Sequence, residues 1–251
     1  MATLRACTYN IRCDTDEDDR PWAARKDDVV DELERIDPDV IALQEAIAHQ
    51  YDDVRSGLSG YDWHGVGRQD GERGGELVPV AWRSGRLEAL ETGVYWLSET
   101  PMKPSTGWDA SLPRIATWAL LDVDGSRLWA VSTHFDHVGR EARRESAPLL
   151  AGWARDRMND GASVLILGDL NCGPSSAPYA SLREAGLEDA HEVAHERSGP
   201  RATYHGFTGS PLVRIDYAWV SPDVTVERYH AVPPASSHRS DHLPVVVDCS
   251  F

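Results

Sequence analysis

Short apolar runs recur along almost the whole chain, and this pattern constrains the fold more than any other feature. Each run is rich in β-branched or aromatic residues and is bounded by turn-forming residues, which is typical of β-strands. So many strands predict a protein organised around β-sheets. The runs cover residues 4–11, 39–45, 61–66, 79–83, 93–98, 115–123, 127–134, 163–171, 214–221, 225–232 and 243–250.

Three segments between these runs have the periodicity of amphipathic helices, at 25–37, 139–160 and 175–186. Pro148 is expected to kink the second segment or to mark a late start. Many strands with few helices predict an α/β sandwich, with two packed sheets and the helices outside. At 251 residues, the chain 1–251 is predicted to form one domain. The loop at 99–114 is long enough to suggest a functional role.

The composition is that of a globular protein with a net charge of −16. This charge opposes non-specific binding to a polyanion such as long DNA. Only Lys26 and Lys103 are lysines, so the acidic surface can also reflect a high-salt habitat, in which salt screens the repulsion. The four cysteines are scattered without a CxxC pair, which predicts reduced thiols rather than a structural zinc site.

No stretch approaches the roughly 20 apolar residues of a membrane span, and the N-terminal residues lack an apolar core of signal-peptide length. We therefore expect a soluble, cytoplasmic protein that does not bind membranes. We also expect a monomer, since no protein partner is evident from the sequence.

Polar residues occur at the ends of six predicted strands. One such residue commonly caps a loop, but six sets in one chain are difficult to explain in that way. Carboxylate and amide oxygens gathered at one rim of a sandwich suit a hard cation such as Mg²⁺. These residues are Asn10, Gln44, Glu45, His134, Asp136, His137, Asp169, Asn171, Asp216, Asp241 and His242.

In this order, the motifs "TYN", "LQE", "THF", "GDLN", "RIDY" and "SDH" resemble the endonuclease/exonuclease/phosphatase superfamily, from residue 4 to residue 248. "VYWLSETP" and "LPRIATWA" resemble a bacterial and archaeal branch near the deadenylase-like members. The resemblance implies a DNase I-like four-layer sandwich of two mixed β-sheets flanked by helices. It also implies a divalent cation, Mg²⁺ or Mn²⁺.

The resemblance further implies a role for each matched residue. Metal binding falls to Glu45, with Asn10 beside it and Asp241 at the metal or its waters. Asp169 orients or deprotonates the attacking water, and Asn171 holds a phosphate oxygen. The remaining implied catalytic residues are His242, which contacts the phosphate; Asp216, which fixes its ring; and His134, a second phosphate contact.

Two further residues are candidate phosphate or substrate ligands, Arg114 in "LPRIA" and His205 in "TYHGF". A surface ion pair is an equal alternative for Arg114, and packing is an equal alternative for His205. One position departs from the family pattern: exonuclease III-like members carry an acid where this chain has Arg12. This departure puts a second metal position in doubt, and Asp14 is a nearby replacement within a charged loop.

These residues predict a divalent-metal-dependent phosphoesterase that hydrolyses P–O bonds by in-line attack of water. A small phosphate ester or a single-stranded nucleic acid is favoured as substrate over duplex DNA, because the chain is acidic and lacks a lysine-rich stretch. An alternative of another class is a catalytically inactive binding module on the same fold. The retention of Glu45, Asp169, Asn171, Asp216 and His242 argues against it.

Overall fold

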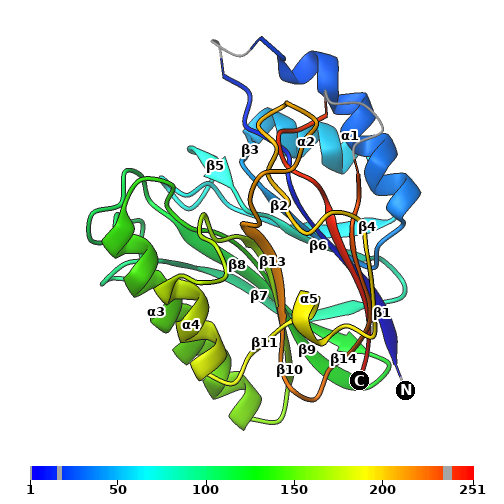
Figure 1. Cartoon of the computed structure of the whole chain (residues 1–251), viewed down its shortest axis with the longest axis vertical. Coiled ribbons are helices and arrows are strands. Elements are labelled where there is room, and N and C mark those ends of the chain that lie inside the picture. The colour runs from blue at the N-terminus through cyan, green and yellow to red at the C-terminus, as the bar shows by residue number, and fades with distance from the viewer. Residues whose placement is uncertain (1, 16–18, 234–238) are drawn as a thin grey trace.

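Two large β-sheets pack face to face in the computed structural model, which describes residues 2–15, 19–233 and 239–251 (Figure 1). The first sheet has the strand order β12-β14-β15-β1-β2-β6-β4. Its strands are β1 (Thr3–Asn10), β2 (Val40–Gln44), β4 (Tyr61–His64), β6 (Val80–Arg83), β12 (Glu196–Ser198), β14 (Thr225–Ala231) and β15 (Val245–Ser250).

The second sheet has the strand order β11-β13-β10-β9-β8-β7. Its strands are β7 (Glu88–Trp96), β8 (Ile115–Val123), β9 (Ser126–His134), β10 (Ser163–Asp169), β11 (Glu188–Asp189) and β13 (Asp216–Val220). Both sheets contain parallel and antiparallel pairs, so both are mixed. A separate two-stranded sheet joins β3 (Ala46–Ile47) to β5 (Glu76–Leu77).

Helices cover the outer faces of the two large sheets (Figure 1). Helices α1 (Trp22–Ile36) and α2 (Ala48–Gly57) pack on the first sheet through one apolar cluster, and α3 (Arg140–Asn159) and α4 (Ala177–Glu184) pack on the second through another. A short helix, α5 (Ala190–Val193), follows β11. A third cluster, drawn from the inward-facing strand residues, fills the space between the sheets. These layers confirm the predicted four-layer sandwich.

The predicted strands and helices are all present, with some changes at their ends. Helix α1 begins at Trp22, three residues before the predicted start, and Asp14 accepts a hydrogen bond from the Trp22 backbone N–H at 2.8 Å. Helix α3 begins at Arg140, so Pro148 lies inside it and does not mark a late start. Ser176 caps α4 by accepting a hydrogen bond from the Tyr179 backbone N–H.

The register of the strands brings the polar strand ends together at one rim. Strands β1 and β2 are parallel, so Asn10 lies opposite Gln44. In the second sheet, β9 and β10 are parallel, and Asp169 lies opposite His134. Strand β13 is antiparallel to β10, which places Asp216 on the other side of Asp169. Residues far apart in the sequence therefore reach the same edge of the sandwich.

Candidate active site

Three residues that follow these strand ends have left-handed backbone conformations. The φ angles are 59° at Arg12, 63° at Glu45 and 47° at Asn171. Residues other than glycine rarely adopt this region, and such strain is concentrated at functional sites. At each position the backbone turns sharply just beyond its strand and lets the side chain line a cavity.

This cavity, which we call the rim cavity, has a volume of about 510 Å³. It contains most of the predicted site residues, together with several that the sequence did not single out. Its lining residues are Arg12, Cys13, Glu45, Glu76, Arg114, His134, His137, Asp169, Asn171, Tyr204, Val213, Ile215, Asp241 and His242.

Asn10 is completely buried and joins the two main carboxylates of the site. Its Nδ2 donates to Oε1 of Glu45 at 2.9 Å and to Oδ2 of Asp169 at 3.1 Å. Its Oδ1 accepts from the backbone N–H of Arg12 at 3.0 Å. Both ends of the amide are thus engaged, so Asn10 positions Glu45 and Asp169 relative to each other.

The Glu45 carboxylate is held in its ionised form. Burial favours the neutral acid, but this effect is outweighed by a hydrogen bond from the Cys13 backbone N–H, by the nearby charge of His242 and by a hydrogen bond from Asn10. Together they lower the pKa of Glu45 below its usual value. The Cys13 N–H donates to Oε2 of Glu45 at 3.0 Å. Glu45 therefore presents a fixed negative charge to the rim cavity.

His242 and Asp216 form a buried pair beside Asp169. Nδ1 of His242 lies 2.9 Å from Oδ2 of Asp216, and its Nε2 lies 3.8 Å from Oδ2 of Asp169. Burial opposes the imidazolium, but the charge of Asp216 and its hydrogen bond prevail and raise the pKa of His242 to about 10. Burial and Asp216 raise the pKa of Asp169 to about 7. Asp169 can therefore exchange a proton near neutral pH.

His134 is surrounded by more hydrogen-bond donors than it can accept from. Arg114 NH1 lies 3.2 Å from its Nδ1, and Asn171 Nδ2 lies 2.9 Å from its Nε2. The same Asn171 nitrogen donates to the Phe135 carbonyl at 3.0 Å, which fixes the orientation of the amide. Burial and Arg114 lower the pKa of His134 well below its usual value, and a neutral imidazole accepts at only one nitrogen. Either Arg114 or Asn171 is thus left with an N–H group that His134 cannot accept, and a phosphate oxygen in the cavity would accept from it.

Several residues of the rim cavity were not identified as site residues from the sequence. Glu76 lies on the two-residue strand β5, and its Oε2 is 2.7 Å from Arg68 NH1. His137 was noted at a strand end only, yet Arg114 NH2 donates to its Nδ1 at 2.9 Å. Tyr204 packs edge-on against the His242 ring, with 4.9 Å between ring centroids. A two-residue strand gives no periodicity that could have revealed Glu76.

Of the ten predicted site residues, nine lie in or directly behind the cavity wall, and His205 does not. Its side chain is fully buried, and it is absent from the cavity lining. Its backbone N–H donates to the Asp241 carbonyl at 2.8 Å. The substrate-contact role expected for His205 thus has no geometric support, whereas its neighbour Tyr204 faces the cavity. Arg114 is buried and holds Asp136, since its Nε donates to Oδ2 at 3.2 Å.

The acidic part of the rim cavity fits a divalent cation. Glu45, Asp241 and Glu76 all line it. Burial is the main cause that raises the pKa of Glu76, and the negative charge of Glu45 raises it further. Burial raises the pKa of Asp241, and the charge of Glu45 adds to the effect. Carboxylates that disfavour one another's ionisation offer oxygen ligands to a hard cation. A buried cluster of Asp169, Asp216 and His242 has metal-ligand spacing too, although its His242 Nδ1 is already bonded to Asp216.

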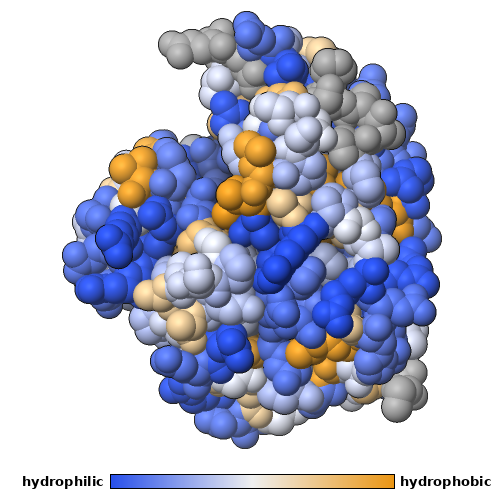
Figure 2. Space-filling view, viewed as in Figure 1, coloured by the Kyte–Doolittle hydropathy of each residue, from blue (hydrophilic) through white to orange (hydrophobic). Residues whose placement is uncertain are grey.

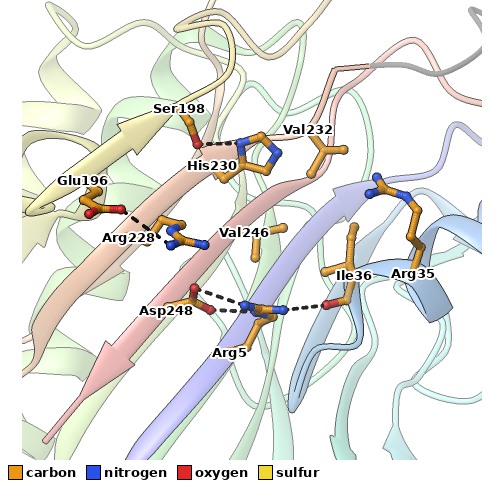
Figure 3. A pocket seen from close by; sticks show the side chains of 10 residues that line it. All are labelled: Arg5, Arg35, Ile36, Glu196, Ser198, Arg228, His230, Val232, Val246 and Asp248. Carbon is orange, nitrogen blue, oxygen red and sulfur yellow. Dashed lines mark hydrogen bonds and ion pairs between the residues drawn. The ribbon is translucent and has the colours of Figure 1, made fainter.

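A second hollow, of about 390 Å³, lies over β1, β14 and β15 (Figure 3). Its charged groups are largely paired with one another. Arg5 Nε lies 2.7 Å from Asp248 Oδ1, and Arg228 NH2 lies 3.5 Å from Glu196 Oε2. Such pairing leaves little drive to bind a charged ligand, so the rim cavity is the better candidate for the functional site.

The sandwich fold and its polar rim are those of a family of hydrolytic phosphoesterases. The chain belongs to the Endonuclease/Exonuclease/phosphatase family, whose model matches residues 7–242. Among the described residues, no helix has both the length and the apolar character needed to cross a membrane.

Solved structures of relatives align over nearly the whole chain. A family protein from Bacteroides vulgatus is 35% identical, with all of both chains covered and a TM-score of 0.94. A mannosyl-6-phosphatase from Bacteroides thetaiotaomicron is 31% identical, with 99% of this chain and 100% of that chain covered and a TM-score of 0.94.

A protein of Acanthamoeba polyphaga mimivirus is 23% identical over 248 residues, which cover 86% of this chain. The alignment covers 35% of the viral protein, so this chain spans about a third of that relative.

Proposed function

We propose that this protein is a Mg²⁺- or Mn²⁺-dependent phosphoesterase that hydrolyses a small phosphate ester. The observation that carries this proposal is the convergence of Asp169, Asn171, His134 and His242 on one wall of the rim cavity. A carboxylate that titrates near neutral pH thus stands beside donors suited to a phosphate group.

The chain's own residues account for most of the reaction. Asp169, held by Asn10, accepts a proton from water as the water oxygen bonds to phosphorus and the P–O bond to the leaving alcohol breaks. Protonated His242 and the donors around His134 stabilise the charge that develops on the phosphate oxygens. A divalent cation held by Glu45 and Asp241 would supply further charge stabilisation. The products are the alcohol, which takes up a proton, and a phosphate.

A small alcohol is favoured as the leaving group. The rim cavity holds about 510 Å³, which suits a small molecule better than a duplex, and the net charge of −16 opposes a polyanion. Val213, Ile215 and the ring of Tyr204 give it an apolar side that suits the C–H face of a sugar. The whole-length similarity to a mannosyl-6-phosphatase supports a sugar phosphate as the first substrate to test.

The test is a panel of sugar phosphates, nucleotides, aryl phosphate esters and labelled oligonucleotides, assayed with Mg²⁺ and with Mn²⁺ at low and molar salt. We expect turnover of small esters that EDTA abolishes and that Asp169→Ala lowers by at least 100-fold. Asp156→Ala on the outer helix α3 is a matched control and should retain full activity. Full activity in Asp169→Ala would contradict the mechanism, and turnover of oligonucleotides alone would contradict the substrate class.

A further inference from the structure

The side chain of Arg12 is a cationic group of the rim cavity to which the proposed reaction assigns no role. It lies on the loop after β1 and lines the cavity. Its NH1 lies 3.8 Å from Oε2 of Glu45, with which it forms an ion pair. The side chain is 37% exposed, so a ligand in the cavity can reach the guanidinium.

The backbone of Arg12 is fixed by contacts from three elements. Its N–H donates to Asn10 Oδ1, and its carbonyl accepts from Arg25 NH2 of α1 and from Gln50 Nε2 of α2, each at 3.0 Å. These bonds maintain the left-handed conformation, with φ at 59°. The surrounding structure therefore holds Arg12 in a backbone conformation that is unfavourable for arginine. Such enforced strain is expected of a residue that is preorganised for binding.

The other guanidinium of the cavity wall is differently placed. Arg114 has a side-chain exposure of 4%, and its nitrogens face Asp136, His134 and His137. Arg114 therefore holds the residues of the cavity wall in place, and its positive charge lies beneath the cavity surface. Arg12 contributes a cation at the accessible surface of a cavity that four carboxylates also line.

We propose that Arg12 is a substrate-binding residue that directs this site to phosphate monoesters rather than diesters; this inference rests on the proposed function. A terminal phosphate carries nearly two negative charges at neutral pH, and a diester carries one. A guanidinium near carboxylates lowers the repulsion felt by the dianion more than that felt by the monoanion. Its planar N–H groups also match two terminal oxygens of one phosphate, which a monoester offers more freely.

The test compares two aryl esters with the same leaving group, 4-nitrophenyl phosphate and bis(4-nitrophenyl) phosphate. In Arg12→Gln we expect kcat/KM for the monoester to fall about 10- to 100-fold, and that for the diester to change less than 3-fold. Arg12→Lys keeps the charge without the planar donors and is expected to give an intermediate loss. Arg144→Gln, an exposed α3 position with the same change in net charge, should leave both rates unchanged.

Calorimetric titration with inorganic phosphate gives a second readout that does not depend on turnover. We expect the dissociation constant to rise about 10-fold in Arg12→Gln and to stay unchanged in Arg144→Gln. Equal losses on both esters, or unaltered phosphate binding, would overturn the role of Arg12. If the wild-type protein hydrolyses neither ester nor any other of the panel, the proposed function fails, and phosphate binding still decides whether Arg12 is an anion ligand.

Discussion

Nδ1 of His242 lies within hydrogen-bond distance of both carboxylate oxygens of Asp216, at 2.9 and 3.1 Å. This contact raises the pKa of His242 to about 10. Its contribution to the stability of the fold is therefore fully present below the usual histidine pKa of about 6.5, and this contribution is lost as the pH rises through about 10. We expect Asp216→Asn to lower kcat about 100-fold or more and to lower the pKa of His242. NMR titration of the imidazole measures this pKa, and an unchanged value would contradict the assignment.

Glu45 is expected to control the binding of the divalent cation. Mg²⁺ should raise the melting temperature of the wild-type protein, EDTA should reverse the increase, and Glu45→Gln should remove most of it, because a ligand stabilises only the state that binds it. Asp52→Asn, which removes an exposed carboxylate on α2, is the control and should keep the response. The same Mg²⁺-dependent increase in Glu45→Gln would exclude Glu45 as a ligand.

The ion pair between Arg214 and Asp189 is buried and bidentate, with N–O distances of 3.1 and 2.7 Å. Arg214→Met leaves a carboxylate buried without its partner, so we expect a loss of about 3–5 kcal/mol in the free energy of unfolding. Thermal denaturation should show a fall in melting temperature on the order of 10 °C. Arg73→Met, which breaks an exposed pair with Asp52, should change it little. Equal falls in melting temperature for Arg214→Met and Arg73→Met would contradict the larger contribution assigned to the buried pair.

Tyr204 and His205 are neighbours with opposite surroundings, and their substitutions should separate binding from stability. Tyr204→Ala removes part of the cavity wall and is expected to raise KM several-fold. His205→Ala empties a buried position and should lower the free energy of unfolding by about 2 kcal/mol while the folded protein keeps its kcat and KM. Steady-state kinetics and urea denaturation measure the two effects. A rise in KM for His205→Ala would restore its predicted contact with substrate.

The acidic surface predicts a protein that salt stabilises. Hydrophilic side chains predominate on the face shown in Figure 2, and the chain carries a net charge of −16. Potassium chloride screens this self-repulsion, so the melting temperature should rise by several degrees between 0.1 and 2 M. Sucrose at matched osmolality is the control for general solute effects. A melting temperature that stays flat with salt would remove the argument for a high-salt habitat.

The sequence predicted most of the fold because its strands are short apolar runs, rich in β-branched and aromatic residues, that end in turn residues. Helices α2 and α5, the pair β3–β5 and the short strands β11 and β12 were not predicted. Helix α2 follows a two-residue strand and has a weak apolar face, with Gln50, Tyr51 and Val54 as its buried residues. Strand β5 has only two residues, so no periodicity can indicate it.

The candidate site was predictable where strand register determines it. Asn10, His134, Asp169 and Asp216 lie at strand ends that pair directly or share a rim. Residues placed by loops were harder to assign. In "TYHGF" only the backbone path decides which of two adjacent rings faces the cavity, and the composition of the motif holds no information on that path.

The left-handed backbone at Arg12, Glu45 and Asn171 has a consequence for the stability of this protein. Each such residue costs roughly 1 kcal/mol, less for asparagine, relative to a glycine at the same position. Glycine at these three positions would relieve that backbone strain, but it would also remove three side chains from the wall of the rim cavity. The protein therefore gives up some stability to hold these side chains in place.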